Sequence, residues 1–298
     1  MQCNKCGRDA VFFQEYSGQH LCERHVEAYV EAKAKHEIRK HKWILPEDHV
    51  AVALSGNSSS SALLYFLKKL TSNRRDIKIS AIFLDEGITG FHDTKNALRI
   101  ARMLDTDCIT GTFQQSFGIT LDEIARRNTG AVSCTYCRIL RNFLLNRIAV
   151  EHRITKLALG HTLDEGAVHV LKNMLRGTPE IFVHSERFAS RMVPRIRPFI
   201  SVPYNEVALY ADLHNLKYEQ SPCPYKNDAF EKNVQKLLND FTIQHPATKY
   251  ALQNLGKHLT GACISMADAV ITCEQCGEPK DGICQNCRIL SEVTAHGD

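Results

Sequence analysis

Two sets of four metal-ligand residues, one near each end of the chain, constrain its folding more than any other feature of the sequence. Each set has the number of donors that a tetrahedral zinc ion needs, with paired donors two residues apart. They are Cys3, Cys6, Cys22 and His25 at the N-terminal end, and Cys273, Cys276, Cys284 and Cys287 at the C-terminal end. The alternative is disulfide bonding. Because no hydrophobic signal segment precedes the first cysteine, we expect the chain to stay in the reducing cytoplasm, which favours zinc.

Three further cysteines, Cys134, Cys137 and Cys223, lie between these sets and are too few to close a zinc shell. Three thiolates with an open fourth position suit an iron–sulfur cluster whose remaining iron can bind a substrate atom such as sulfide. The alternative is that Cys134 and Cys137 form a redox pair and that Cys223 is an unrelated buried thiol. Cys108 and Cys263 have no partner at a ligand spacing, and we expect them to be core residues.

The composition predicts one sizeable core with small appendages, since the chain has 298 residues, of which 44% are hydrophobic and 23% charged. No apolar run is long enough to span a bilayer, so we expect no membrane association. The net charge of +4 permits a nucleic-acid partner without requiring one.

A basic segment follows the first zinc set. It contains Lys33, Lys35, Arg39, Lys40 and Lys42, with Trp43 at its end. A run of this kind is usually the solvated face of a helix, but lysines beside a zinc module also commonly contact phosphates. Both interpretations remain open at this point.

Between the two zinc sets, strand patterns alternate with helical patterns, which predicts a parallel sheet covered by helices on both faces. We expect strands at residues 49–54, 77–84, 107–110 and 156–159, and helices at residues 58–70, 94–104, 121–127, 136–152 and 164–175. Active sites in sheets of this class lie at the carboxyl ends of the strands. The candidate chemistry of this chain falls at those ends.

The first strand end is a turn rich in small hydroxyl residues, Ser55-Gly56-Asn57-Ser58-Ser59-Ser60-Ser61. Free amides and hydroxyls at a helix N-terminus can bind an anion. The alternative is an ordinary helix start capped by serine.

Carboxylates follow two other predicted strands. They are Asp85 and Glu86 after the second strand and Asp164 and Glu165 after the fourth. Such carboxylates could hold Mg²⁺ on a nucleotide or cap helices, and the sequence is compatible with both roles.

Several ordered motifs accompany the two zinc sets: IFLDEGI at residues 82–88, Cys134-x2-Cys137 followed by Leu140-Arg141, GHTLD at 160–164, LRG at 175–177 and PCPY at 222–225. Together they resemble the TtcA/TtuA family of PP-loop tRNA thiolation enzymes, and most closely the TtuA-like tRNA 2-thiouridine synthetases. The resemblance extends over almost the whole chain.

The resemblance implies an α/β fold, a PP-loop parallel sheet of the adenine nucleotide alpha hydrolase-like type flanked by helices, with zinc-binding modules at both ends. The implied domains are an N-terminal zinc finger at 1–28, a basic linker helix at 29–48, a PP-loop catalytic domain at 49–225, a helical extension at 226–268 and a C-terminal zinc finger at 269–298.

The same resemblance implies a tRNA sulfurtransferase that adenylates the C2 oxygen of a uridine with ATP and Mg²⁺, and in which a [4Fe-4S] cluster delivers sulfur. A ubiquitin-like sulfur carrier protein and a homodimer are also implied. The implied catalytic residues are Asp164 and Arg141, and the implied cluster ligands are Cys134, Cys137 and Cys223. The implied nucleotide-binding residues are Ala53, Ser55, Gly56, Ser60, Ser61, Ile82, Asp85, Gly160 and His161.

The sequence departs from the family at the nucleotide loop, which usually reads SGGKDS. Asn57, Ser58 and Ser59 here replace a glycine, a lysine and an aspartate. The side chain of Asn57 could obstruct the approach of the backbone to phosphate, and a cation is missing. Two alternatives to ordinary catalysis follow: a non-adenylating paralogue that serves as a tRNA-binding or regulatory subunit, and an ATP-independent iron–sulfur protein of sulfur trafficking.

Smaller departures occur outside the loop. Glu165 replaces a second aspartate, Asn142 replaces an arginine, and Glu231 and Gln235 stand where the family carries basic residues. An acidic residue that faced phosphates would repel RNA. The alternative is drift at positions that tolerate change.

Overall fold

The computed structural model describes residues 1–91, 94–127, 133–178, 192–218, 223–225, 229–266, 273–274, 276 and 283–294. Pro222 of the PCPY motif and the side chain of Cys263 lie outside this description, as do parts of the two C-terminal segments expected at 226–268 and 269–298.

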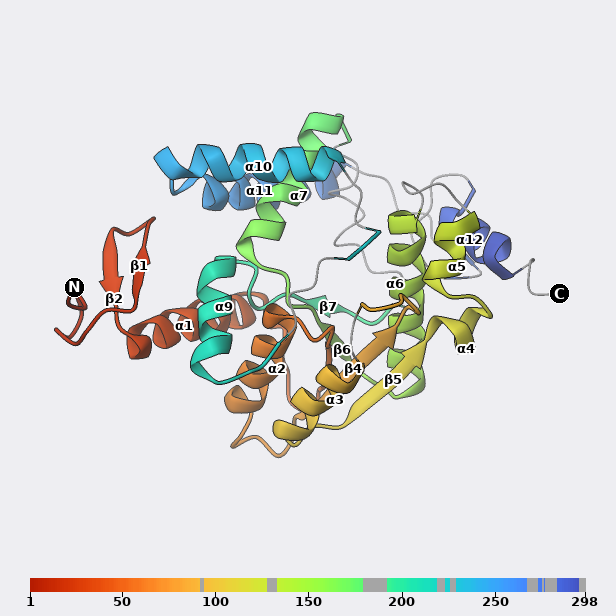
Figure 1. Cartoon of the computed structure of the whole chain (residues 1–298), viewed down its shortest axis with the longest axis horizontal. Coiled ribbons are helices and arrows are strands. Elements are labelled where there is room, and N and C mark those ends of the chain that lie inside the picture. The colour runs from red at the N-terminus through yellow and green to blue at the C-terminus, as the bar shows by residue number, and fades with distance from the viewer. Residues whose placement is uncertain are drawn as a thin grey trace.

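A five-stranded parallel sheet forms the centre of the molecule (Figure 1). Its order is β5-β4-β3-β6-β7, with β3 in the middle. The strands are β3 (His49–Ala53), β4 (Lys78–Asp85), β5 (Cys108–Thr112), β6 (Lys156–Ala158) and β7 (Arg195–Ile196). The first four confirm the strands expected from the sequence, whereas the short β7 was missed.

The two faces of the sheet belong to two different hydrophobic cores. Val50 and Val52 of β3 point into one core, and Ala51 between them points into the other. All three are completely buried, because helices cover both faces. This double burial explains why the strand reads as a continuous apolar run.

One core is closed by four helices: α1 (Glu23–His41), α2 (Ser58–Leu70), α3 (Thr94–Met103) and α9 (Tyr204–Leu213). The other is closed by α4 (Phe113–Phe117), α5 (Leu121–Arg127), α6 (Ser133–Glu151) and α12 (Gln285–Thr294). A third, smaller cluster joins α7 (Leu163–Arg176) to α10 (Ala229–Gln244), and α11 (Thr248–Met266) packs on α7. The helices expected within the sheet region are confirmed to within three residues at each end.

The N-terminal module consists of the hairpin β1 (Phe12–Gln14) and β2 (Gln19–Leu21), followed by the start of α1. Helix α1 begins at Glu23, so it supplies His25 to the metal-ligand set and also packs against the main core. Its buried residues Val26, Val30 and Ala34 are fully enclosed. The helix thus joins the module directly to the sheet domain.

The basic segment on α1 is divided by the structure. Lys33 turns inward, where its ammonium group donates to the hydroxyls of Tyr16 and Tyr250 and pairs with Glu206 at 3.3 Å. Phosphate contact is therefore the wrong interpretation for Lys33. Lys40, by contrast, is exposed to solvent.

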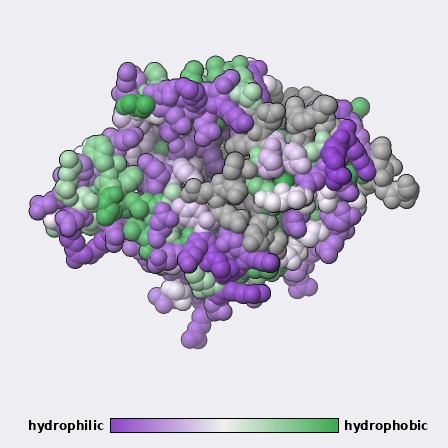
Figure 2. All heavy atoms as spheres, in the orientation of Figure 1, coloured by the Kyte–Doolittle hydropathy of each residue, from purple (hydrophilic) through white to green (hydrophobic). Residues whose placement is uncertain are grey.

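Exposed apolar side chains occur mainly outside the sheet. Figure 2 shows such side chains over the N-terminal module, where Val11 and Phe13 are each about half exposed, and others at the top of the view, above the sheet. Leu237 and Phe241 on α10 are also exposed. Among the helices that the structure describes, none has the length and apolar character needed to cross a membrane.

Candidate functional site

The serine-rich turn connects the end of β3 to the start of α2, as the sequence predicted. Gly56 has a φ of 84°, a conformation that glycine adopts without strain, and it lets the chain reverse into the helix. The four serines from Ser58 to Ser61 are buried, each less than 6% exposed. The turn is therefore a compact loop enclosed by the surrounding protein.

Asn57 occupies one of the helix amides that an anion would need. Its Oδ1 accepts a hydrogen bond from the backbone N–H of Ser60 at 2.8 Å, which makes it the N-cap of α2. The hydroxyls of Ser60 and Ser61 donate back to the carbonyl of Asn57. The turn therefore starts a capped helix, as the alternative interpretation expected, but the cap is Asn57 rather than a serine.

Gly160, at the end of β6, lies directly against the loop. A Cβ atom there would come within 2.9 Å of the backbone carbon of Ser59 and the backbone nitrogen of Ser60. Only a glycine permits this close approach without a shift of the backbone. The neighbouring strands β3 and β6 thus bring the GHTLD segment to the loop.

Asp164 lies at the start of α7, and both of its oxygens are engaged. Oδ1 accepts from Lys249 of α11 at 2.6 Å, and Oδ2 accepts from the backbone N–H of Tyr204 at 2.6 Å. The Tyr204 hydroxyl in turn lies 3.4 Å from the hydroxyl of Ser58 in the loop. The expected catalytic carboxylate is therefore held at the edge of the loop region by two partners that the sequence did not indicate.

The other candidate carboxylates have structural partners. Asp85 accepts a hydrogen bond from the backbone N–H of Gly87, and Glu165 accepts one at 2.9 Å from the backbone N–H of Thr162 at the start of α7. Glu231 pairs with Lys172 at 2.5 Å, which offsets the charge that would otherwise repel RNA. These contacts support the helix-capping interpretation for Glu165.

His161 follows Gly160 and is surrounded by positive charge. Desolvation by the surrounding protein and the charges of Arg197, His169 and Arg195 lower its pKa to about 3. The imidazole is therefore neutral at physiological pH, so that it can donate or accept a hydrogen bond but adds no charge.

The three central cysteines approach one another on the side of the sheet covered by α6. Cys134 and Cys137 lie on α6, and Cys223 packs against the same core as Cys137. Burial raises the pKa of the Cys137 thiol to about 11, which the nearby Arg141 opposes and the sulfurs of Cys223 and Cys134 reinforce. The Cys134 thiol lies 3.1 Å from the carbonyl of Tyr225.

The spacing of these sulfurs differs from that of a zinc set. Among the described residues, both terminal sets have every donor atom within 4.8 Å of the others, whereas the three central cysteines do not form such a group. A single zinc ion with Zn–S bonds of about 2.3 Å requires sulfurs about 3.8 Å apart. The triad is therefore not arranged as a zinc set, and three thiolates with an open fourth position are a donor set that an iron–sulfur cluster can take.

Arg141 contacts both this triad and a buried acid. Its Nη2 atom lies 3.3 Å from Cys137 Sγ and 2.7 Å from Glu86 Oε1. Glu86 is 4% exposed and follows β4, so the pair joins the end of that strand to α6. The sequence placed Arg141 near the cysteines, but it did not identify Glu86 as its partner, because no local spacing relates the two residues.

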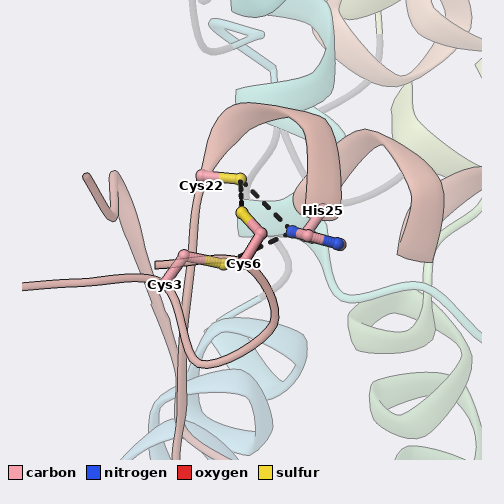
Figure 3. Close-up of side chains that lie close together, drawn as sticks. All are labelled: Cys3, Cys6, Cys22 and His25. Atoms are coloured by element: carbon pink, nitrogen blue, oxygen red, sulfur yellow. Dashed lines mark hydrogen bonds between the residues drawn. The ribbon is translucent and has the colours of Figure 1, made fainter. Parts of the chain in front are cut away.

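The four N-terminal donors Cys3, Cys6, Cys22 and His25 lie together, as a group that could hold a metal ion (Figure 3). His25 Nδ1 lies 3.3 Å from the sulfurs of both Cys3 and Cys22, and the sulfurs of Cys6 and Cys22 are 3.7 Å apart. These separations match the edges of a tetrahedral zinc shell, about 3.8 Å between sulfurs.

The C-terminal set has the same geometry. Its sulfur pairs, Cys273 with Cys287 and Cys276 with Cys284, are 3.6 Å and 3.5 Å apart. All eight terminal cysteine and histidine ligands therefore stand where zinc could be held. The cysteines among them are free thiols in the structure, so the disulfide alternative is not favoured.

Comparison with known proteins identifies the sheet domain and the N-terminal module. Residues 26–238 match a family described as a PP-loop domain, and residues 2–25 match the N-terminal LIM domain of 2-thiouridine synthetase TtuA. The "tRNA 2-thiolation protein NcsA" of Haloferax volcanii is 30% identical over 99% of this chain and all of its own length. A "Probable sulfurtransferase" of Methanocaldococcus jannaschii is 30% identical over 98% of this chain and 88% of its own.

A solved structure has the same fold over nearly the whole chain. The U34-tRNA thiolase NcsA from Methanococcus maripaludis, solved with its [4Fe-4S] cluster, superposes with a TM-score of 0.86 and 26% identity, covering 98% of this chain and 96% of the other. The chain therefore belongs to the PP-loop family of tRNA 2-thiolation proteins that includes NcsA and TtuA.

Proposed function

We propose that this protein is a tRNA 2-thiouridine sulfurtransferase that activates a uridine with ATP and replaces its C2 oxygen with sulfur. The observation that carries the proposal is that two features follow neighbouring parallel strands, at the same edge of the sheet. A strand-to-helix loop follows β3, and Glu86, which pairs with Arg141 beside Cys137, follows β4. Full-length similarity to tRNA 2-thiolation proteins supports the same activity.

The loop side of the site would bind the nucleotide. Ser55 and Gly56, with the amides at the start of α2, can contact phosphate oxygens once Asn57 releases the Ser60 amide. Ala53 and Ile82, paired in register on β3 and β4, would lie beside the base. Transfer of AMP to the uracil oxygen makes that oxygen part of a stable leaving group.

The carboxylates and His161 would complete the nucleotide side. Asp85 and Asp164 stand at the carboxyl ends of the strands, where they could hold Mg²⁺ on the phosphates if their present partners moved. Neutral His161 would serve as a hydrogen-bonding group in a positively charged environment. Arg195 and Arg197, which lie near His161, would attract an anionic substrate.

The sulfur side of the site consists of Cys134, Cys137 and Cys223, which would hold a [4Fe-4S] cluster with one iron left open. Such a cluster, when bound, presents sulfide to the activated carbon. Arg141 would contribute positive charge beside the reacting atoms, where negative charge develops.

The partners and location follow from the same proposal. The substrate would be tRNA in the cytoplasm, since relatives carry the name "Cytoplasmic tRNA 2-thiolation protein 1". A ubiquitin-like carrier would supply sulfur, the two terminal sets would each hold zinc, and the protein would act as a homodimer.

The capping of Ser60 by Asn57 favours one alternative, a non-adenylating paralogue that binds tRNA without activating it. A direct test is the restored loop with Asn57→Gly, Ser58→Lys and Ser59→Asp. If wild-type protein binds ATP by calorimetry and thiolates tRNA in an anaerobic assay, the natural loop suffices. If only the restored protein does so, the natural chain is the paralogue.

Metal content tests the sulfur side separately. Anaerobically reconstituted wild-type protein should contain two zinc ions and show iron–sulfur absorption in the visible range. Replacement of Cys134, Cys137 or Cys223 by Ala should remove that absorption and leave zinc in place, because the terminal sets are closed without them. Wild-type protein that takes up no iron and sulfide would contradict the proposed cluster.

A further inference from the structure

The bridge between Glu86, Arg141 and Cys137 has a geometry that the catalytic proposal does not explain. A single nitrogen, Arg141 Nη2, makes both contacts, at 2.7 Å to the Glu86 carboxylate and 3.3 Å to the Cys137 sulfur. This nitrogen carries two N–H bonds, so it can donate one to each acceptor. The carboxylate therefore determines where the second N–H points.

Glu86 is held more firmly than Arg141. Glu86 is 4% exposed, and its backbone carbonyl accepts a hydrogen bond from Leu121 at the start of α5. The Arg141 side chain is 41% exposed and lies one helical turn after Cys137 on α6. Arginine has a long side chain with many rotamers, and the contact with the buried carboxylate limits that freedom.

We infer that Glu86 is a positioning residue, which fixes the Arg141 guanidinium on the Cys137 sulfur and thereby raises the reduction potential of the iron–sulfur group held by the triad. The inference rests on the proposed role of the three cysteines as cluster ligands. A hydrogen bond from a cation to a ligand sulfur stabilises the more negatively charged, reduced state of such a group.

The midpoint potential of one variant distinguishes a positioning role of Glu86 from a purely electrostatic one. Glu86→Asp keeps the negative charge but shortens the side chain by one methylene, which draws the guanidinium away from the sulfur. If Glu86 acts through the position of Arg141, the midpoint potential of this variant falls. If Glu86 acts only as a nearby charge, the potential stays unchanged.

The experiment is an EPR-monitored redox titration of the reconstituted full-length chain, with Arg141→Gln as the reference for loss of the hydrogen bond. We expect both Arg141→Gln and Glu86→Asp to lower the potential, and Glu86→Asp to cause no further fall in the Arg141→Gln background. Glu151→Asp, the same change at the far end of α6, where Glu151 lies 3.8 Å from Arg147, is the matched control and should leave the potential unchanged.

The outcomes distinguish the two proposals. The positioning role is overturned if the cluster of Glu86→Asp has an unaltered midpoint potential. It is also overturned if Glu86→Asp lowers the potential further in the Arg141→Gln background. Either result leaves the sulfurtransferase proposal standing. Failure of the wild-type triad to assemble a cluster overturns both. Iron and zinc content, measured for every variant, shows that the compared proteins are equally loaded.

Discussion

At the scale of single residues, Asn57 caps helix α2 in the loop that we propose binds the nucleotide. Its side chain satisfies the Ser60 amide at 2.8 Å, so an incoming phosphate must compete with an intramolecular hydrogen bond. Such a bond contributes about 1 kcal/mol, equivalent to roughly a fivefold change in affinity. The same hydrogen bond stabilises the start of α2 and would weaken the binding of an anion to the loop.

We therefore expect Asn57→Gly to tighten ATP binding by about fivefold in calorimetry while lowering the free energy of unfolding by only a few tenths of a kcal/mol. Asn57→Asp is the matched variant, because it retains the cap but adds a negative charge, and it should weaken ATP binding. Equal affinities for the two variants would show that the Asn57 cap does not compete with phosphate.

At the scale of elements, the end of β6 determines where α2 begins. The loop reaches its position because Gly160 offers no side chain where the backbone of Ser59 and Ser60 passes. The position of the loop therefore depends on the pairing of β3 with β6, because these two strands are neighbours in the parallel sheet.

Gly160→Ala should displace the start of α2 and lower the free energy of unfolding by about 1–3 kcal/mol, because its Cβ would come within 2.9 Å of loop backbone atoms. The affinity of Gly160→Ala for ATP should also fall, because the loop at the start of α2 would be displaced. Gly118→Ala is the control: its φ of 71° makes alanine costly by about 1–2 kcal/mol, but no atom lies within 4 Å of its Cβ. Chemical denaturation of that control should show lower stability with unchanged ATP affinity, whereas full stability of Gly160→Ala would contradict the packing argument.

At the scale of the whole molecule, Lys33 ties three distant segments together. It joins Tyr16 of the N-terminal module to Glu206 of α9 and Tyr250 of α11, and Gln14 also donates to Glu206 at 2.8 Å. The N-terminal module is thus anchored to the sheet domain by a largely buried polar network as well as by α1.

Lys33→Met should lower the free energy of unfolding by about 3 kcal/mol, because it leaves the buried Glu206 carboxylate without its cation. Denaturant titration measures this loss. The salt dependence of tRNA binding should not change, since Lys33 faces inward.

The double variant Lys40→Gln and Lys42→Gln is the counterpart on the same helix. Both side chains are exposed, so stability should be unchanged, while the slope of log affinity against log salt should become shallower by about two. An unchanged slope would show that Lys40 and Lys42 do not contact tRNA phosphates.

The sequence by itself determined the features that depend on local spacing. The alternation of strands and helices predicted where the first four strands of the sheet and the helices between them lie along the chain, and the C-x2-C spacings predicted both terminal donor sets. These features follow from contacts within a strand, a helix turn or a short loop. A single sequence is sufficient for them because the interacting residues are close together along the chain.

The tertiary structure decided the partners of the charged residues. Arg141 pairs with Glu86 across 55 positions, Lys249 with Asp164 across 85, and Lys33 with Glu206 across 173. No periodicity encodes such pairs, because which acid meets which base depends on how helices pack on the sheet. For that reason the sequence indicated the cysteines and the loop, whereas only the fold showed that Glu86 contacts Arg141 and that Lys33 faces inward.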